Sequence, residues 1–153
     1  MRRTTLTVIV LAALAGLASA AVSSASGGIK GAAAGGKLKV RISDMNAGGK
    51  GDSVTNGGLA GTGRFTASGA ISEKGKAVVY RTVKMPLITL RYVTAGKKGT
   101  ITFVVKIDTN VVPSTSRWTI TSGTKAYTGL HGAGTESENA DFGVSTLTGT
   151  VTR

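Results

Sequence analysis

The sequence predicts an all-β protein whose main part is an eight-stranded antiparallel β-barrel. Apolar and polar residues alternate from Lys37 onward, which is the period of a strand with one buried face. Turn-forming residues recur roughly every eight to twelve residues, a spacing typical of sandwiches and barrels. No convincing amphipathic helix follows residue 20. About eight strands can close around side chains or one small ligand, and closure removes the edges through which sheets aggregate.

Residues 1–20 have the pattern of a secretory signal peptide. Arg2 and Arg3 form a basic head, residues 6–17 are mostly apolar, and small residues precede a cleavage point after Ala20. The apolar run is shorter than the roughly 20 residues that a membrane-spanning helix needs. We therefore expect a secreted, extracellular protein whose mature chain has no transmembrane segment. Arg2 and Arg3 are compatible with export by either the Sec pathway or the twin-arginine pathway.

Residues 21–36 are predicted to form a flexible tether. They are almost all Ala, Gly and Ser, so they bury too little apolar surface to offset the entropy lost on ordering. Residues 37–153 follow as a single β-barrel domain, because the 133 residues left after cleavage suffice for one core and not for two. The chain has no cysteine, so packing alone must hold this domain together.

The composition is strongly basic, with 19 Lys and Arg against 7 Asp and Glu, a net charge of +12. Loss of Arg2 and Arg3 with the signal peptide leaves a net charge of +10. Such a charge favours polyanions, which outside a cell are envelope polymers or anionic lipid heads. Aromatic residues make up only 5% of the chain, which disfavours nucleic acid as a partner. The alternative is a solvated basic surface without a partner.

Eight runs carry strand patterns. In the first run, Leu38, Val40 and Ile42 point to one side, and Lys39 and Arg41 point to the other. The predicted strands cover residues 37–43, 64–71, 77–84, 87–94, 100–107, 117–121, 130–138 and 142–151.

The connections have distinct turn signals. Residues 44–63 are rich in glycine and are expected to form a long loop. Residues 73–76 are expected to be a short hairpin loop in which Gly75 is left-handed. Pro86 interrupts its strand pattern, as at a bulge or an edge.

Residues 122–134, SGTKAYTGLHGAG, are predicted to form a tight corner that closes one end of the barrel. Gly123, Gly129 and Gly132 can take positive φ or let another backbone approach closely. Tyr127 and Leu130 are expected to turn inward as lids on the core. An ordinary glycine-rich connection is the alternative interpretation.

Residues 122–132, SGTKAYTGLHG, resemble the glycine-rich S-G-T-G-x-Y-x-G-L-x-G corner of the allene oxide cyclase barrel-like group. This group includes plant cyclases, dirigent proteins and many secreted bacterial proteins. Residues 63–66, GRFT, and 147–151, LTGTV, are similar to strands of the bacterial members. The resemblance covers roughly residues 63–151 and departs at Lys125, where a glycine is common. It implies a calycin-like eight-stranded barrel and a homo-oligomer, since plant members are often trimers. No stretch matches the substrate-handling residues of the group.

Four residues are candidates for lining a ligand pocket: Tyr80, Tyr92, Arg91 and Trp118. The aromatic residues could equally be plain core, since they lie at strand spacing. Arg91, like Arg81, could hold an anionic ligand head or lie on the outer wall.

No catalytic residue, metal site or cofactor is expected. His131 is the single histidine, no G-x-S-x-G elbow occurs, and His131 lies within the corner. Glu136, Glu138 and Asp141 form an acidic cluster in which the two glutamates share a strand face. Paired carboxylates can do acid–base work. We interpret this cluster as a solvated strand end.

Two functions are compatible with the sequence. The first is a secreted, non-catalytic barrel that binds a small apolar or amphipathic ligand or an envelope component. The second is an allene oxide cyclase-like or dirigent-like enzyme acting on a ligand inside the barrel. The enzyme needs an inward carboxylate, tyrosine or arginine around a cavity, whereas the binding protein needs no converging polar groups. Adhesion through surface lysines is a third alternative that needs no cavity.

Overall fold

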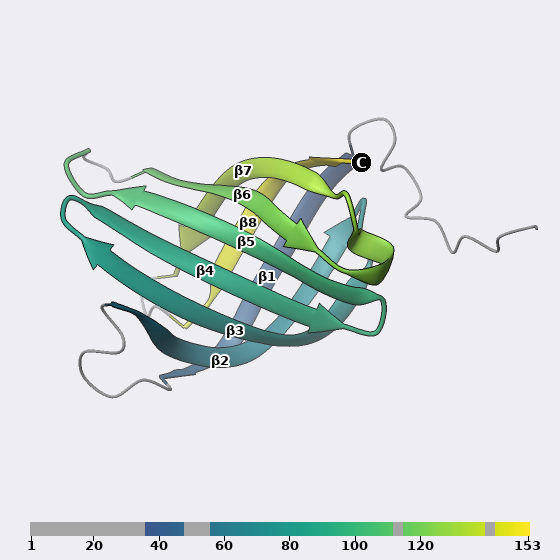
Figure 1. The fold of residues 1–153 in the computed structure, drawn as a ribbon, viewed down its shortest axis with the longest axis horizontal. Helices are drawn as coiled ribbons and strands as arrows, with labels where there is room; N and C mark the ends of the chain where they lie inside the picture. The colour runs from purple at the N-terminus through teal and green to yellow at the C-terminus, as the bar shows by residue number, and fades with distance from the viewer. Residues whose placement is uncertain (1–35, 48–55, 112–114, 140–142) are drawn as a thin grey trace, which may run out of the picture.

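The computed structural model describes residues 36–47, 56–111, 115–139 and 143–153, which form a closed antiparallel barrel (Figure 1). The predicted signal peptide and all but the last residue of the predicted tether lie outside the described residues. The strands are β1 (Gly36–Ala47), β2 (Asn56–Gly69), β3 (Glu73–Lys84), β4 (Leu87–Gly96), β5 (Gly99–Asp108), β6 (Thr115–Gly123), β7 (His131–Glu138) and β8 (Ser145–Thr152).

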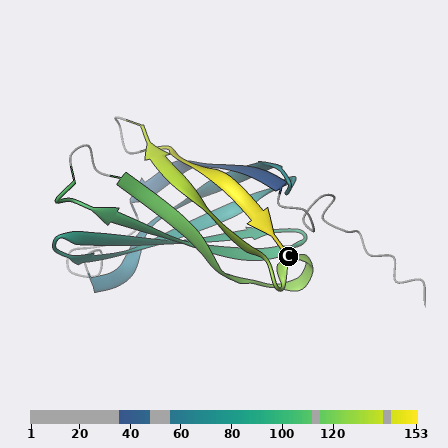
Figure 2. The ribbon, with the colours of Figure 1, turned by 90° about the horizontal axis from the view of Figure 1, so that it is seen from above.

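The barrel closes because every strand pairs with the next and β8 returns to β1. The closing pairs run from Gly36 opposite Val151 to Ile42 opposite Ser145. Figure 2 shows the strands winding around one elongated interior. The predicted eight-stranded antiparallel barrel is therefore confirmed.

The core follows the period-two alternation of the strands. Leu38, Val40 and Ile42 are buried, whereas Lys39 and Arg41 between them are exposed. Each later strand sends its own alternate residues inward. The largest fully buried side chains are Trp118, Tyr92, Tyr127 and Phe103.

Two predicted connections are corrected by the structure. Residues 44–63 are not one long loop, because β1 extends to Ala47 and β2 begins at Asn56. Residues 73–76 are not a hairpin loop, because all four pair with β2 and Gly75 and Lys76 also pair with β4. Gly75 is not left-handed. The turn falls instead at residues 70–72, after Gly69 at φ 94°. Gly75 is needed for close approach, since a Cβ atom there would lie 2.0 Å from the Ala95 carbonyl oxygen.

The predicted corner folds as a short 3-10 helix, η3 (Lys125–Tyr127), at one end of the barrel (Figure 1). Backbone hydrogen bonds join it to the β4–β5 turn: the Thr124 N–H donates to the Thr100 carbonyl at 3.0 Å and the Ala126 N–H donates to the Lys98 carbonyl at 3.2 Å. Tyr127 and the following Leu130 are 1% and 3% exposed. This end of the barrel is therefore closed by packed side chains.

The three corner glycines serve two different needs. Gly129 has φ 74°, which favours glycine. Gly123 and Gly132 are not left-handed but are closely approached. A Cβ atom would lie 2.1 Å from the Tyr127 carbonyl oxygen at Gly123, and 2.7 Å from the Thr150 carbonyl oxygen at Gly132.

A candidate ligand cavity at the open end of the barrel

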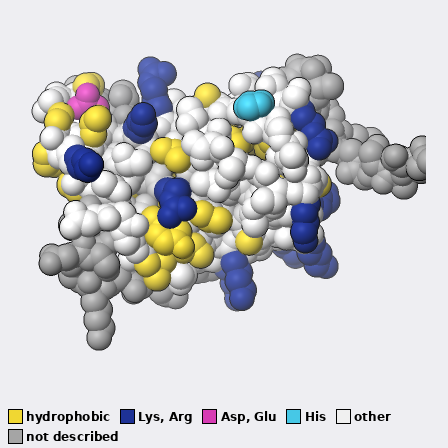
Figure 3. All heavy atoms as spheres, in the orientation of Figure 1, with side chains coloured by type: hydrophobic (Ala, Val, Ile, Leu, Met, Phe, Trp, Pro, Cys, Tyr) yellow, Lys and Arg dark blue, Asp and Glu magenta, His cyan; other side chains and the backbone are white. Residues whose placement is uncertain are grey.

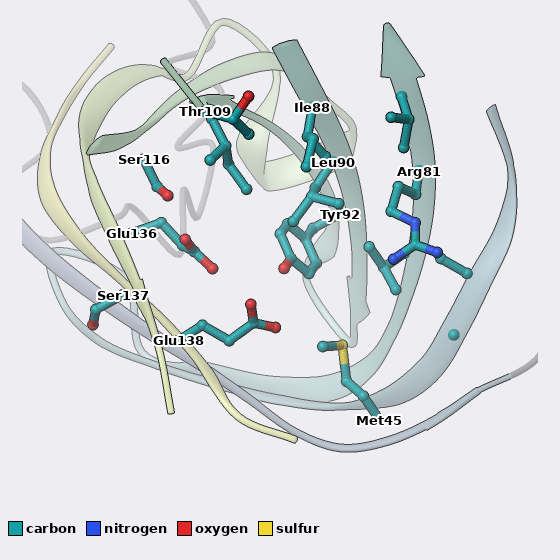
Figure 4. Close-up of a pocket in the computed structure, with 15 residues that line it drawn as sticks. Met45, Arg81, Ile88, Leu90, Tyr92, Thr109, Ser116, Glu136, Ser137 and Glu138 are labelled. Atoms are coloured by element: carbon teal, nitrogen blue, oxygen red, sulfur yellow. The ribbon is translucent and has the colours of Figure 1, made fainter. Parts of the chain in front are cut away.

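A cavity of about 750 Å³ occupies the end of the barrel away from η3, and Figure 4 shows the side chains that line it. Its position follows from the strands, because its lining includes Ile107 and Thr109 near the end of β5, whereas η3 contacts the start of that strand. The lining residues are Met45, Ala60, Gly61, Val79, Arg81, Val83, Ile88, Leu90, Tyr92, Ile107, Thr109, Ser116, Glu136, Ser137 and Glu138.

One wall of the cavity is mainly apolar, with Arg81 of β3 between its apolar residues. It is built by Val79 and Val83 of β3, Ile88 and Leu90 of β4, and Ile107 of β5. These strands are neighbours, and alternate residues of each face inward. The wall can therefore receive the hydrocarbon part of a ligand.

The opposite wall is polar and comes mainly from β7. Glu136 and Glu138 alternate with Ser137, so both carboxylates point toward the cavity, where Glu136 is buried and Glu138, the last residue of β7, is exposed (Figure 4). Glu136 exposes only 9% of its surface, and its Oε1 atom has no hydrogen-bond partner among the described residues. The interpretation of this cluster as a solvated strand end is wrong for Glu136, which barrel closure buries, whereas Glu138 at the end of β7 is exposed. Asp141, the third acid of the predicted cluster, lies outside the described residues.

The two cavity carboxylates are harder to ionise than ordinary glutamates. Burial raises the pKa of Glu136, and hydrogen bonding from Ser145 and Ser116 only partly offsets this. Burial also raises the pKa of Glu138, and the negative charge of Glu136 adds to the increase. The Arg81 charge acts on Glu138 in the opposite direction.

Tyr92 forms the junction between the cavity and the packed core. Its side chain is fully buried, and its hydroxyl shares a 3.0 Å hydrogen bond with the Ser145 hydroxyl. Burial raises the pKa of Tyr92 well above its ordinary range, and Glu136 and Glu138 contribute to the increase. Tyr92 is therefore neutral near pH 7 and can donate or accept a hydrogen bond.

Arg81 supplies the positive charge of the cavity. It lies on β3, and Figure 4 shows it on the side of the cavity opposite Glu136 and Ser116. Carboxylates, a phenol and a guanidinium thus converge on one cavity.

The four predicted ligand residues do not gather in one place. Tyr92 lines the cavity, whereas Trp118 is 1% exposed in the core and packs edge-on against Phe103 with ring centroids 5.6 Å apart. Tyr80 and Arg91 are directly paired across β3 and β4 on the outer wall. The Arg91 guanidinium lies 4.1 Å from the Tyr80 ring centroid, a cation–π contact.

Sequence reasoning missed Glu136, Glu138 and Ser116 as cavity residues, and it left the side of Arg81 open. A signal was present for the glutamates, because Gly132, Gly134, Glu136 and Glu138 are all on one strand face. The signal was weak, because Gly132 and Gly134 separate the glutamates from Leu130, the nearest apolar residue on that face of the predicted strand.

Other chemistry-bearing groups lie elsewhere. His131 begins β7 on the exposed face, and Figure 3 shows it at the molecular surface. Within the described ranges, no three His, Cys, Asp or Glu side chains are placed to hold a metal ion. In the same ranges, no helix has the length and apolarity to cross a membrane.

Together these features define a class: a closed eight-stranded barrel with one sealed end and, at the other, a cavity with apolar and polar walls. Comparison of the chain with protein-family models, curated proteins and solved structures found no significant match.

Proposed function

We propose that the protein is a secreted barrel that binds a small amphipathic ligand in the cavity. The observation that carries this proposal is the buried Glu136, whose Oε1 atom lacks a partner, facing an apolar wall across about 750 Å³. Small-molecule sites typically have volumes of roughly 300–1,000 Å³, mostly apolar walls and a few placed polar groups.

The polar end of the cavity is unfavourable for stability on its own. An unpaired buried polar group costs about 1–3 kcal/mol, and a charged one costs more. A ligand that pairs with Glu136 and covers the apolar wall relieves both deficiencies. This supports binding as the function over adhesion through the outer surface alone, for which a cavity is unnecessary.

Export is part of the proposal. The basic head, apolar run and small residues before Ala21 support cleavage after Ala20 and an extracellular location. N-terminal sequencing of the protein from culture supernatant is expected to begin at Ala21. Retention of Met1 in that material would contradict cleavage.

The binding proposal is tested by extracting the natively secreted protein and identifying released small molecules by mass spectrometry. Val83→Trp fills the cavity with an indole and is expected to abolish ligand recovery. Val93→Trp is the matched control, because Val93 lies on β4 between inward-facing Tyr92 and Thr94 and so points outward. Equal recovery from the two variants would place the ligand outside the cavity.

A second candidate function is acid–base catalysis on the bound ligand. The observation that favours it is the convergence of carboxylates, the Tyr92 phenol and Arg81, the polar groups that an enzyme in this barrel needs. The resemblance of residues 122–132 to the allene oxide cyclase barrel-like group also supports it. Burial raises the pKa of Glu136, so its carboxyl holds a proton more readily than an ordinary glutamate does.

The two candidates are separated by incubating the extracted ligand with the protein in deuterated water. A binding protein returns the ligand unchanged. An enzyme that moves protons gives deuterium incorporation or a rearranged product, and Glu136→Gln abolishes it while Asp108→Asn does not. Asp108 is a suitable control because it lies on β5 beside inward-facing Ile107 and does not line the cavity.

A further inference from the structure

We propose that the cavity selects amphipathic amines, with the ammonium group at Glu136 and Glu138 and the hydrocarbon part against the apolar wall. This inference rests on the proposed binding function and names the chemistry of its ligand. It is carried by three observations: an unpaired buried carboxylate oxygen, a second carboxylate on the same face, and the charge balance of the cavity.

The first observation is the Oε1 atom of Glu136, which lies in the cavity wall without a hydrogen-bond partner among the described residues. When the carboxyl is ionised, Oε1 receives no hydrogen bond from a donor. When the carboxyl is protonated at Oε1, its O–H has no acceptor. An ammonium group has three N–H donors and satisfies the ionised form with charge-assisted hydrogen bonds, which are stronger than neutral ones.

The second observation is Glu138, two residues further along β7, which lines the same cavity (Figure 4). The Glu136 charge disfavours ionisation of Glu138, so the two carboxylates lie within electrostatic range. A cation between them relieves this repulsion, because it interacts favourably with both. A carboxylate head adds a third negative group to the same space.

The third observation is the charge balance. The ionisable lining residues are Glu136, Glu138, Tyr92 and Arg81, so the cavity carries one net negative charge when both carboxylates are ionised and Tyr92 is neutral. The whole chain is +12, and Figure 3 shows Lys and Arg side chains spread over the visible surface. The field outside favours the approach of anions, so selectivity for a cation must arise inside the cavity.

The groups that face Glu136 determine the pH dependence of binding. They are Glu138 on β7, Tyr92 on β4 and Arg81 on β3, together with the uncharged Ser116 on β6 and Ser145 on β8. Guanidinium groups do not lose their proton in proteins, and the raised pKa of Tyr92 keeps its phenol neutral, so the carboxylates are the groups that change charge. Amine affinity should increase as pH rises through the pKa values of the two glutamates, and stay high until the amine itself deprotonates near pH 10. For a ligand that needs a protonated carboxyl, affinity decreases as pH rises.

The test is a calorimetric titration of the intact chain near pH 7 with three probes of equal chain length: octylamine, octanol and octanoate. Octylamine is expected to bind at least about ten-fold more tightly than octanol, the size of one charge-assisted hydrogen bond. Octanoate is expected to bind more weakly than octanol. The octylamine affinity should rise between about pH 4 and pH 8, with octanol as the pH control.

Glu136→Gln keeps the side-chain shape and removes the charge, and is expected to reduce octylamine binding to the level of octanol. Asp108→Asn, a carboxylate-to-amide change outside the cavity, should leave the ranking intact. If octanol or octanoate binds as tightly as octylamine, or Glu136→Gln leaves the ranking unchanged, the amine assignment is wrong while the binding function stands. If none of the probes binds, the proposed binding function itself is contradicted.

Discussion

At the scale of single residues, Glu136 is the side chain whose surroundings are least favourable for folding stability. A carboxyl that is 9% exposed and has an unpaired oxygen destabilises the fold, and residues selected only for packing avoid this arrangement. Its pKa is raised above the ordinary value of about 4.5, so the folded chain binds a proton more tightly than the unfolded chain does. Folding stability should therefore decrease as pH rises from the ordinary value through the raised one.

Glu136→Gln is expected to stabilise the ligand-free protein by about 1–2 kcal/mol at pH 7, because the amide needs no ionisation in a buried site. The gain should shrink as pH falls below the raised pKa of Glu136, where the native carboxyl becomes protonated. Urea melts of both proteins at pH 7 and across the acid range measure this. A variant less stable than the parent at pH 7, with the same pH dependence, would show that Glu136 is well accommodated.

The second unfavourable feature at this scale is a left-handed backbone conformation in the corner. Lys125 has φ 54°, the one described non-glycine residue at positive φ, and Gly129 has φ 74°. Left-handed backbone costs a non-glycine residue roughly 1–2 kcal/mol, whereas a glycine loses about 0.5–1 kcal/mol more backbone entropy. The balance favours glycine at both positions.

Lys125→Gly is expected to stabilise by up to about 1 kcal/mol, whereas Lys125→Ala should be nearly neutral because it keeps the strain. Gly129→Val should destabilise by about 1–2 kcal/mol through conformation alone, since a Cβ atom there meets no atom within 4 Å. Thermal melts of the three variants test the order. A destabilised Lys125→Gly would mean that lysine contacts outweigh the strain.

At the scale of elements, η3 is held to β3 by the Tyr127 hydroxyl, which donates to Glu73 Oε2 at 2.9 Å. The Lys98 N–H also donates to that oxygen, at 3.0 Å, and joins the β4–β5 turn to the same carboxylate. Burial alone raises the pKa of Glu73, but hydrogen bonds from Lys98, Tyr127 and Lys74 outweigh it and hold the pKa below its ordinary value. The stability from this contact is present above the ordinary pKa and is lost as pH falls through the lowered one.

Tyr127→Phe is expected to destabilise by about 1 kcal/mol at pH 7, because it removes one hydrogen bond and keeps the packed ring. The difference should disappear below the pKa of Glu73, where the parent also loses the ionised acceptor. Denaturant melts across the acid range measure this, with Tyr80→Phe on the outer wall as a control. If the stability lost in Tyr127→Phe does not change with pH, the loss comes from packing and not from the hydrogen bond to Glu73.

Packing between β6 and β8 is the other element-scale feature. Trp118 donates from Nε1 to the Thr148 carbonyl at 3.2 Å, and its ring covers Gly149, where a Cβ atom would lie 2.6 Å from Trp118 Cζ2. The glycine therefore makes the space that the indole fills.

Trp118→Ala is expected to destabilise by about 3–5 kcal/mol, because it opens a large cavity in the packed core. Gly149→Ala should also destabilise, by overpacking the same contact. Both are measured by denaturant melts. A Trp118→Ala loss below about 1 kcal/mol would mean that the indole is not the centre of this core.

At the scale of the whole molecule, charge is segregated. Basic side chains are scattered over the outside, as Figure 3 shows on the visible face, whereas Glu136 and Glu138 point into the cavity and Glu73 joins the elements of the closed end. The exterior is therefore more uniformly positive than the composition alone indicates. Such a surface attracts polyanions without a shaped site.

Binding to an anionic polymer such as heparin is expected to be weak and to decrease steeply with salt, because the screening length falls to roughly 3 Å at 1 M. Elution from a heparin column at increasing salt measures this. Glu136→Gln should elute with the parent, since its change is inside the barrel. Retention that does not respond to salt would indicate a specific site on the outer wall.

The sequence by itself determined the fold class and the inward face of most strands. Period-two alternation is local, so runs such as Leu38, Val40 and Ile42 or Phe103 and Val105 identify their buried side without knowledge of their partners. The corner was also predictable, because Tyr127 and Leu130 are the large apolar residues within a glycine-rich run.

Only the tertiary structure decided the site. Residues 77–83 have apolar residues on both faces, so pairing with β4 was needed to place Tyr80 outside and Arg81 inside. The face of β7 that carries Glu136 has two glycines and no apolar residue, so its burial comes from Trp118 and Leu147 on the neighbouring strands. Alternation assigns faces within a strand, but the depth of each inward residue depends on how closure staggers the strands, which is a non-local property.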